Sequence, residues 1–277
     1  ADRDKLSEAL RALARQDPTF ESRSDPETGQ TLISGMGELH LEVLKHRLMR
    51  DMNVQVNVGR PRVSYRETVS GSAEAEGRFI RQTGGRGQYA VVRLAVAPHV
   101  PEDGGQHVVF ENQVKGGAIR REFVDAVGAG VRDSARSGVL AGFPIINIQV
   151  TVLDGQEHDV DSSELAFENA GRIAFEEAVR KAGPTLMEPI MVLELTTPEV
   201  YFGSVTGDLN ARRAVITHTE LRRDRRVIRA QVPLREMVGY ATALRSLTQG
   251  RAGWSMEPYQ YAVVPPQVAE QILATAY

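Results

Sequence analysis

Two short segments carry residue types that suit contact with an anionic partner. The first segment, Gln82–Gln88, places glycines and a single arginine between two strand-like stretches. Glycine lets the backbone approach a nucleic-acid surface closely, and arginine can pair with phosphate or stack on a base. The candidate RNA-contacting residues are Gly84, Gly85, Arg86, Gly87 and Gln88. A flexible hairpin without a partner is the alternative interpretation of this loop.

The second segment, His158–Glu164, precedes an alanine-rich helical stretch. Asp161 is placed to cap that helix, and Glu164 follows three residues later, as in a capping box. A helix start favours phosphate groups through its exposed amides and positive dipole end, and His158 lies just ahead of it. The candidates here are His158, Asp159, Val160, Asp161 and Ser162. A metal interpretation is also open, although no fixed ligand spacing selects a metal.

A third group is a run of arginines in a chain whose formal net charge is -3. Seven arginines fall within eighteen positions, from Arg212 to Arg229. A local basic patch of this kind fits an RNA or another anionic partner, whereas arginines at strand edges are often only solvated. The candidate contacts are Arg212, Arg213, Arg222, Arg223 and Arg225.

Several enzyme motifs are missing from the sequence. It has no G-x-x-x-x-G-K-[ST] phosphate loop, no H-E-x-x-H motif and no G-x-S-x-G motif. Gly128 and Gly130 lie in a helical pattern without the strand that a dinucleotide site requires, so they indicate close helix packing. The lack of cysteine excludes disulfides and thiolate metal sites. The sequence therefore predicts no catalytic residue, no metal site and no cofactor-binding residue in this chain.

The composition is that of a soluble globular protein. With 277 residues the chain is long enough for two or three domains, and its hydrophobic and charged contents, 42% and 25%, are ordinary. No run of about 18 apolar residues occurs, so a membrane-spanning helix is not expected. Because the pI is only about 6.1, RNA contact should come from local patches rather than from a globally basic surface.

The last part of the chain, residues 184–277, has the order β-α-β-β-α-β, which is the ferredoxin-like arrangement. The expected strands are Pro189–Thr197, Ala214–Leu221, Arg226–Pro233 and Trp254–Val264. The expected helices are a short one within Val200–Arg213 and a longer one over Leu234–Leu247, with Gly250 as its left-handed cap. A terminal helix, Pro266–Thr275, is expected to dock on this domain.

The first part, residues 1–67, repeats this pattern without its first strand. The expected helices are Lys5–Arg15 and Glu38–Arg50. The expected strands are Phe20–Ser24, Gln30–Ser34 and Val54–Val58, which gives the order α-β-β-α-β. The missing strand is central to a ferredoxin-like sheet. Because the chain also begins without methionine, we expect the natural protein to continue upstream and to supply that strand.

The middle part, residues 68–183, has a different α/β order. The expected strands are Tyr89–Ala97, His107–Glu111 and Ile146–Val152. The expected helices are Ile119–Ser137 and Glu164–Lys181. Breaks at Pro61 and at Gly183–Pro184 mark the domain boundaries. The predicted fold class is therefore α+β, with domains 1–67, 68–183 and 184–277.

The sequence resembles the C-terminal part of translation elongation factor G. The runs DPETGQTLISGMGELHLEVL (Asp25–Leu44) and VNVGRPRVSYRET (Val56–Thr68) resemble the third domain of that family. Its fourth domain resembles GGRGQY (Gly84–Tyr89) and HDVDSSELAF (His158–Phe167). Its fifth domain resembles EPIM, GDLNARR and VPLREMVGYATALRSLTQGRA, the last spanning Val232–Ala252. These matches are collinear over nearly the whole chain.

The resemblance implies a ribosome-dependent GTPase that drives movement of tRNA and mRNA. Its nucleotide site lies in an N-terminal domain that this sequence lacks, so GTP and Mg would belong to the full-length protein and this chain alone would not be an enzyme. The middle domain is expected to have a fold similar to a ribosomal protein S5 domain, between two ferredoxin-like domains. A cytoplasmic monomer without membrane contact is implied.

The resemblance also assigns partners to the candidate residues. The two loops would form a tip that contacts tRNA and mRNA at the small-subunit decoding site and stops tRNA slipping back. The last domain, with its arginines, would lie near the large-subunit factor-binding RNA and the stalk base. The first domain would relay between the GTPase region and the small subunit.

The sequence departs from the family pattern just before the second loop. Gln156 and Glu157 stand where the family commonly has Ser-Tyr, which removes an aromatic stacking candidate and adds a negative charge. Tyr201-Phe202 and Ala214–Ile216 also depart from it. A paralogous GTPase for ribosome recycling is therefore one alternative, and a ribosome-protection GTPase is disfavoured because both tip loops are retained. A stand-alone RNA-binding module and a metalloenzyme centred on His158 are the others.

Overall fold

The structure, a computed structural model, describes residues 2–26, 28–35, 38–59, 62–81, 87–102 and 106–276. The chain forms two compact units, one of residues 1–64 with 189–260 and one of residues 65–188 with 261–277. Each unit is described by itself. The domain bounds 1–67, 68–183 and 184–277 remain a prediction, because the compact units divide the chain in a different way.

The second unit contains a four-stranded sheet in the order β4-β5-β7-β6. Strand β5 pairs antiparallel with both β4 and β7, whereas β6 runs parallel to β7. The strands are β4 (Ala73–Arg81), β5 (Gln88–Pro98), β6 (Val108–Asn112) and β7 (Ile148–Gln156). Their apolar residues alternate with polar ones, so one face of the sheet is buried and the other faces solvent.

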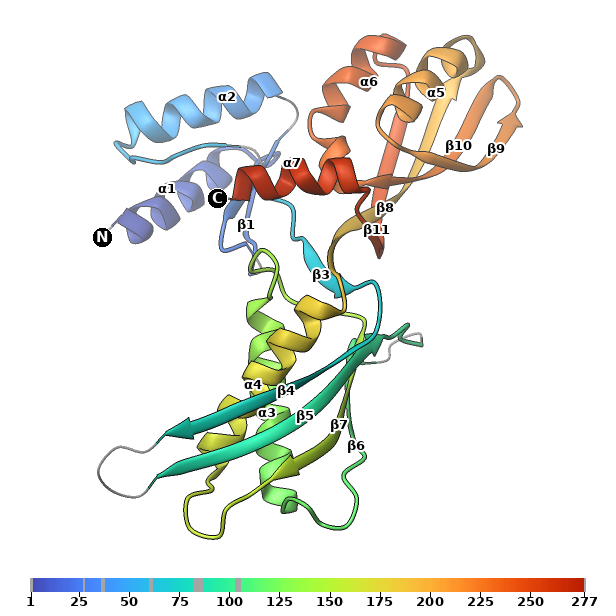
Figure 1. The fold of residues 1–277 in the computed structure, drawn as a ribbon. Helices are drawn as coiled ribbons and strands as arrows, with labels where there is room; N and C mark the ends of the chain where they lie inside the picture. Colours follow the sequence, from blue (N-terminus) through green and yellow to red (C-terminus); the bar gives the residue numbers. More distant parts are fainter. Residues whose placement is uncertain are drawn as a thin grey trace. The chain divides into compact units, whose positions relative to one another are not determined.

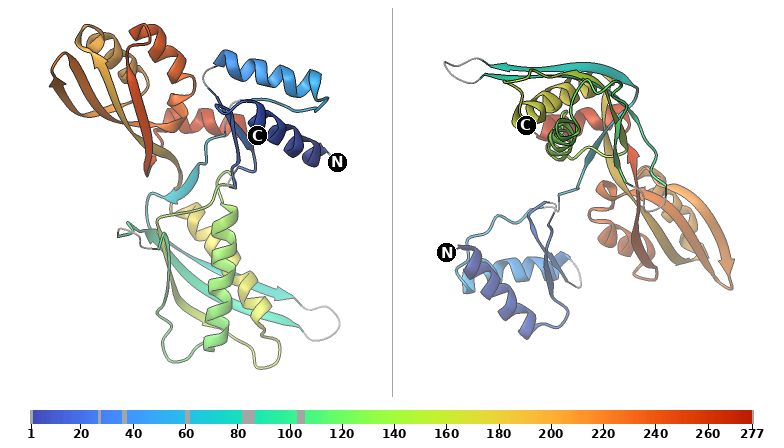
Figure 2. Two further views of the ribbon diagram at one scale, coloured as in Figure 1. Left: turned by 180° about the vertical axis from the view of Figure 1, so that it is seen from behind. Right: turned by 90° about the horizontal axis from the view of Figure 1, so that it is seen from below.

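Two helices, α3 (Arg121–Ser137) and α4 (Glu164–Lys181), cover the buried face of this sheet. Figure 1 shows them lying side by side, and Figure 2 shows the same layering from behind and from below. A Cβ on Gly130 would come within 2.2 Å of the Glu168 carbonyl oxygen of α4. The prediction that this glycine permits close helix packing is therefore confirmed.

The remainder of the second unit joins distant parts of the chain. Strand β3 (Arg66–Val69) pairs with the first residues of β8 (Pro184–Pro198). Helix α7 (Pro266–Ala276) packs with a cluster that includes Leu186 of β8 and Phe143. The reason is its apolar face, on which Ile272 is buried against this cluster.

Glu67 of β3 is fully buried, yet its carboxylate is satisfied by backbone amides alone. One oxygen accepts hydrogen bonds from the amides of Val139 and Leu140, at 2.7 and 2.8 Å. The other accepts from Ala141 and Phe143, at 2.8 and 3.0 Å. A buried carboxylate is tolerated only with such partners, so Glu67 fixes the loop that follows α3.

The first unit contains the ferredoxin-like sheet, in the order β11-β8-β10-β9. The other strands are β9 (Val215–Arg222), β10 (Arg225–Pro233) and β11 (Gly253–Val263), and helix α5 spans Phe202–Ala211. This order confirms the predicted β-α-β-β-α-β arrangement. The sheet's helix-facing core includes Leu193, Leu195 and Ile228.

The single helix expected over Leu234–Leu247 is wrong. A 3-10 turn covers Leu234–Met237, and helix α6 begins only at Tyr240 and runs to Thr248. Between them Gly239 has a φ of 75°, which lies outside the right-handed helical region. The apolar periodicity continues across this break because both pieces pack on the same core.

The N-terminal part of the first unit has helices α1 (Asp2–Gln16) and α2 (Glu38–His46), extended by a π-helical turn over Arg47–Asp51. Strands β1 (Glu21–Ser24) and β2 (Thr31–Ser34) form a two-stranded antiparallel sheet. Val54 is buried, but Val54–Val58 is not a strand, so that expectation is wrong.

The described part of the chain contains no helix that is both long and apolar enough to cross a membrane. Its longest helix, α4, has 18 residues and alternates a buried apolar face with charged positions. The amphipathic pattern matches its place on the sheet of the second unit.

We predict that Glu67→Gln destabilises the second unit by about 2–4 kcal/mol. Each carboxylate oxygen accepts two amides, so a side-chain NH2 would face two N–H donors that it cannot bind. Urea unfolding followed by amide exchange at residues 139–143 measures the effect. Glu76→Gln, at an exposed ion pair with Arg78, is the control and should change little. Equal effects of both variants would contradict the role of Glu67.

Candidate nucleic-acid interface

The topology of the second unit brings the end of β4, the start of β5 and the ends of β6 and β7 to one end of its sheet (Figure 1). Strand β5 begins at Gln88, opposite Arg81, the last residue of β4. Strand β7 is antiparallel to β5 and ends at Gln156, opposite Val91. Strand β6 is parallel to β7, so its end at Asn112 points the same way. The predicted loops and the β6–α3 turn therefore share this end, here called the tip.

Hydrogen bonds join the two predicted loops directly. The Gly87 amide donates to a carboxylate oxygen of Asp161 at 3.0 Å, and the Tyr89 amide donates to the Asp161 carbonyl at 2.8 Å. The Ser162 hydroxyl donates to the Tyr89 carbonyl at 2.7 Å. Gly87 and Ser162 are buried, so these contacts are shielded from water. Three hydrogen bonds thus join the described residues of the two loops.

The ring of His158 is held by backbone amides of its own turn. Its Nδ1 accepts hydrogen bonds from the amides of Val160 and Asp161, at 3.3 and 3.2 Å, and the His158 amide donates to the Ser162 hydroxyl at 2.8 Å. Amides can only donate, so these two contacts suit the neutral tautomer with its proton on Nε2. The same Nδ1 also lies 3.6 Å from a carboxylate oxygen of Asp161. The side chain is 53% exposed, so the ring offers an Nε2–H donor at the tip.

The predicted capping role of Asp161 is wrong. Ser163 is the N-cap of α4, and its hydroxyl accepts from the Ala166 amide at 3.2 Å. Asp161 is turned to the other loop instead, where its carboxylate accepts the Gly87 amide. Glu164 lies in the first turn of the helix, where a negative charge is favoured by the helix dipole.

The predicted tip residues therefore fall into three groups. Gly84, Gly85 and Arg86 lie outside the described residues. Gly87, Asp161 and Ser162 hold the loops together, and Gln88 pairs with Arg81 in the β4–β5 ladder. His158, Asp159 and Val160 are exposed and form the outer surface of the turn. Among the described residues no three His, Cys, Asp or Glu side chains converge as metal ligands would.

Two tip residues were missed by reasoning from the sequence. The Tyr89 hydroxyl donates to the Gln156 side chain at 3.2 Å, and its ring centroid lies 6.0 Å from that of His158. The Arg120 guanidinium lies 3.3 Å from the Glu157 carboxylate. Tyr89 adjoins the first loop and could have been noticed as an aromatic beside basic residues. Arg120 lies 37 positions from Glu157, and no local signal connects them.

The arginine cluster in the first unit is largely balanced by carboxylates. The ion pairs are Arg212–Asp208, Arg213–Glu236, Arg222–Glu220, Arg226–Glu199 and Arg229–Glu194. Hydrogen bonds from Arg226 hold the pKa of Glu199 below its usual range. A cluster that reads as a basic patch in the sequence is therefore much less positive in the fold.

The five predicted arginine contacts divide by position. Arg212 is mostly buried, with a side chain that is 19% exposed and lies 5.0 Å from the ring centre of Tyr240. Arg213 is 28% exposed. The other three, Arg222, Arg223 and Arg225, lie on the exposed turn between β9 and β10. All three are exposed, although Arg222 pairs with Glu220 and Arg225 donates to the Arg251 carbonyl at 3.2 Å.

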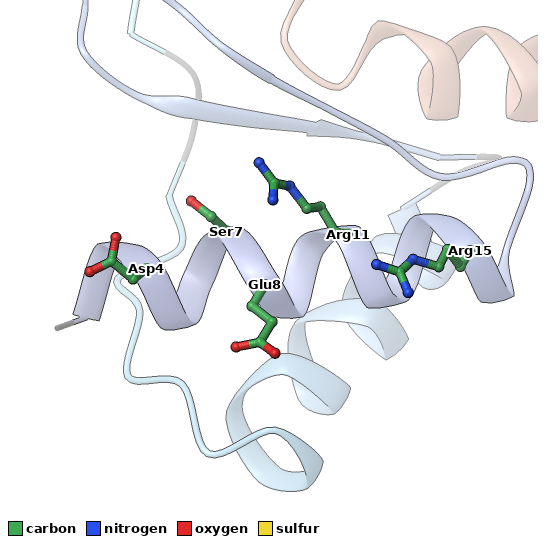
Figure 3. Close-up of a pocket in the computed structure, with 5 residues that line it drawn as sticks. All are labelled: Asp4, Ser7, Glu8, Arg11 and Arg15. Carbon is green, nitrogen blue, oxygen red and sulfur yellow. The ribbon is translucent and has the colours of Figure 1, made fainter.

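An open hollow of about 490 Å³ along α1 offers no comparable site. It is lined by Asp4, Ser7, Glu8, Arg11 and Arg15, all from one helix. Figure 3 shows Glu8 and Arg11 pointing in opposite directions, so these side chains do not converge on a ligand. The hollow is the solvated flank of a helix.

Comparisons with known proteins agree with this fold along the whole chain. Family models described as elongation factor G domain III, elongation factor G domain IV and elongation factor G C-terminus match residues 1–60, 61–183 and 185–272. Elongation factor G of Thermotoga maritima is 52% identical over 273 residues, which are 99% of this chain and 39% of that protein. Elongation factor G of Thermotoga neapolitana matches with the same figures.

A solved structure from Thermus thermophilus has the same fold. It superposes with a TM-score of 0.85 at 40% sequence identity, covering 99% of this chain and 41% of that chain. The predicted α+β fold class, with ferredoxin-like domains flanking an S5-like domain, is thereby confirmed.

Fold, tip and matching domain models together define a multidomain chain of the translation-factor class. The chain belongs to the elongation factor G family. It spans 39% of the length of the curated relatives that it matches.

We predict that Asp161→Ala loosens the contact between the two tip loops by about 1–3 kcal/mol, because it leaves the Gly87 amide without its acceptor. Amide exchange at Gly87 and Tyr89, measured by NMR, should become faster. Asp161→Asn keeps an acceptor oxygen and should have a smaller effect. Asp159→Ala, at an exposed position of the same turn, is the control. Unchanged exchange in Asp161→Ala would show that other contacts hold the loops.

Proposed function

We propose that this chain is the ribosome-binding part of a translation elongation factor that promotes movement of tRNA and mRNA. The tip of the second unit acts at the small-subunit decoding site. The observation that carries the proposal is the His158 turn, which offers a ring donor on a base locked to the neighbouring loop. The family relationship suggests the ribosome as the partner, and the His158 ring is a hydrogen-bond donor that can bind RNA there.

The task at the decoding site requires placement rather than bond-making. A donor such as His158 Nε2–H can bind a phosphate, a ribose hydroxyl or a base edge of RNA. A rigid tip that occupies the space vacated by tRNA raises the barrier to its return. The hydrogen bonds at Gly87 and Ser162 order the tip before it meets RNA. A flexible tip would have to be ordered on binding, at a cost in conformational entropy, and would place His158 less accurately.

We propose that the energy for movement comes from GTP hydrolysis in another part of the full-length protein, with Mg as its metal cofactor. The present sequence contains no phosphate loop, and among the described residues no metal-ligand cluster forms. Because the sequence has no phosphate loop, we propose that this chain alone neither binds GTP nor hydrolyses it. Its three proposed domains, 1–67, 68–183 and 184–277, would transmit and apply the change as a cytoplasmic monomer.

The exposed turn between β9 and β10 is the proposed contact with large-subunit RNA near the stalk base. Arg222, Arg223 and Arg225 lie there, and arginine on such a turn can reach phosphates. Arg212 and Arg213 are held by Asp208 and Glu236 and would mainly support the domain.

A second candidate is a paralogous factor for ribosome recycling. It is favoured by one observation, the Gln156–Glu157 sequence before the His158 turn, which departs from the family's common Ser-Tyr. The two functions separate in a reconstituted assay, because recycling splits ribosomal subunits whereas translocation moves tRNA within an intact ribosome.

We predict that His158→Ala slows tRNA movement by roughly tenfold or more while leaving ribosome-stimulated GTP hydrolysis nearly intact. The measurement uses a chimera in which this chain replaces the matching segment of Thermotoga maritima elongation factor G. His107→Ala is the control, since His107 is also exposed but precedes β6, away from the tip. Equal loss of movement and hydrolysis would count against the proposed role of the tip.

We predict that binding of the isolated chain to ribosomes weakens as salt rises, because phosphate contacts release counterions. Arg223→Ala should reduce the slope of log K against log salt by about one. Arg229→Ala is the control, because Arg229 is already paired with Glu194 at 2.8 Å. Salt-independent binding would indicate a hydrophobic protein partner instead.

A further inference from the structure

Glu157 ties the residue before His158 to the start of helix α3. One carboxylate oxygen accepts the backbone amide of Arg120 at 3.0 Å, and the other lies 3.3 Å from the Arg120 guanidinium. The Glu157 side chain is only 26% exposed. A single carboxylate therefore binds both the main chain and the side chain of the same residue, which defines its geometry more closely than an isolated surface ion pair would.

Arg120 is itself anchored to the core. Its guanidinium lies 4.3 Å from the ring centre of Phe123, and that ring stacks on Phe167 of α4 with centroids 4.5 Å apart. A Cβ on Gly155 would lie 3.0 Å from the side chain of Ile119, so the residues before Arg120 already touch β7. Glu157 thus contacts Arg120, and Arg120 contacts the core residue Phe123 of the second unit.

The two flanks of the His158 turn are held in different ways. On one flank, Ser162 binds the His158 amide and the Tyr89 carbonyl. On the other flank, Gln156 ends β7 opposite Val91 and accepts the Tyr89 hydroxyl, and Glu157, the last residue before the turn, binds Arg120. Removing the second anchor would let the turn pivot about the first. The Arg120 guanidinium also lies 3.0 Å from the Glu122 carboxylate, so Glu122 and Glu157 share this one cation.

We propose that Glu157 is a positioning residue for the tip, which orients the His158 turn through Arg120. The proposal rests on the proposed function of the tip and adds a residue that the sequence suggested would oppose RNA binding. The ion pair of Glu157 with Arg120 ties the His158 turn to the turn between β6 and α3. The negative charge of Glu157 therefore supports RNA contact by its neighbour instead of opposing it.

The test measures tRNA movement and GTP hydrolysis in the chimera with Thermotoga maritima elongation factor G. Glu157→Ala should slow movement on the order of tenfold without slowing hydrolysis, because it removes both bonds to Arg120. Glu157→Gln keeps an acceptor for the Arg120 amide and should recover most of the rate. Arg120→Ala keeps the amide bond to Glu157 and removes only the guanidinium contact, so it should slow movement by a smaller factor. The double variant should be no slower than Glu157→Ala alone.

The matched control is another ion pair of the second unit. Arg172 and Asp133 join α4 to α3 at 2.7 Å, with side chains that are 40% and 54% exposed. Asp133→Ala should shift the thermal unfolding temperature about as much as Glu157→Ala but leave tRNA movement unchanged. This comparison separates positioning of the tip from general support of the fold.

The outcomes distinguish the proposal from the function on which it rests. If His158→Ala slows movement but Glu157→Ala does not, the positioning role is overturned while the proposed function stands. If neither variant slows movement, the proposed function of the tip fails as well. Equal slowing by Glu157→Ala and Asp133→Ala would assign the effect to stability alone and would also overturn the proposal.

Discussion

The antiparallel pairing of β5 and β7 is the constraint on which the tip depends. It places the start of one strand beside the end of the other, with Val91 opposite Gln156. From that register Tyr89 reaches Ser162, and Gly87 reaches Asp161. A shift by one residue would turn every side chain to the other face and separate these partners. The two loops, more than seventy positions apart, form one surface because this ladder holds them in register.

Helix α3 is fixed at both ends by a carboxylate that binds backbone amides. At its start Glu157 accepts the Arg120 amide, and beyond its end Glu67 accepts four amides of the following loop. Between them the helix packs against α4 at glycine contacts and through the stacked rings of Phe123 and Phe167. A rigid base of this kind suits a tip whose proposed task is to hold a position against RNA.

Local patterns predicted the elements well where one face of an element is buried. Helix α4 was expected over Glu164–Lys181 and is observed over the same residues, because its apolar spacing matches a single packed face. Prediction failed where a neighbour decides the outcome. Val54–Val58 has the alternation of a strand but no described partner strand, and Leu234–Leu247 keeps its periodicity across the break at Gly239.

The sequence by itself determined the fold class, the order of the elements, the two tip segments and the family resemblance. These follow from local periodicity, turn residues and long motifs, all of which are properties of neighbouring positions. Only the tertiary structure decided what the polar residues bind. Asp161 binds the other loop instead of capping its helix, Glu157 finds Arg120, and Arg212 finds Asp208 and the ring of Tyr240. Which charged residues pair depends on their distance in the folded structure, and their spacing in the sequence does not give that distance.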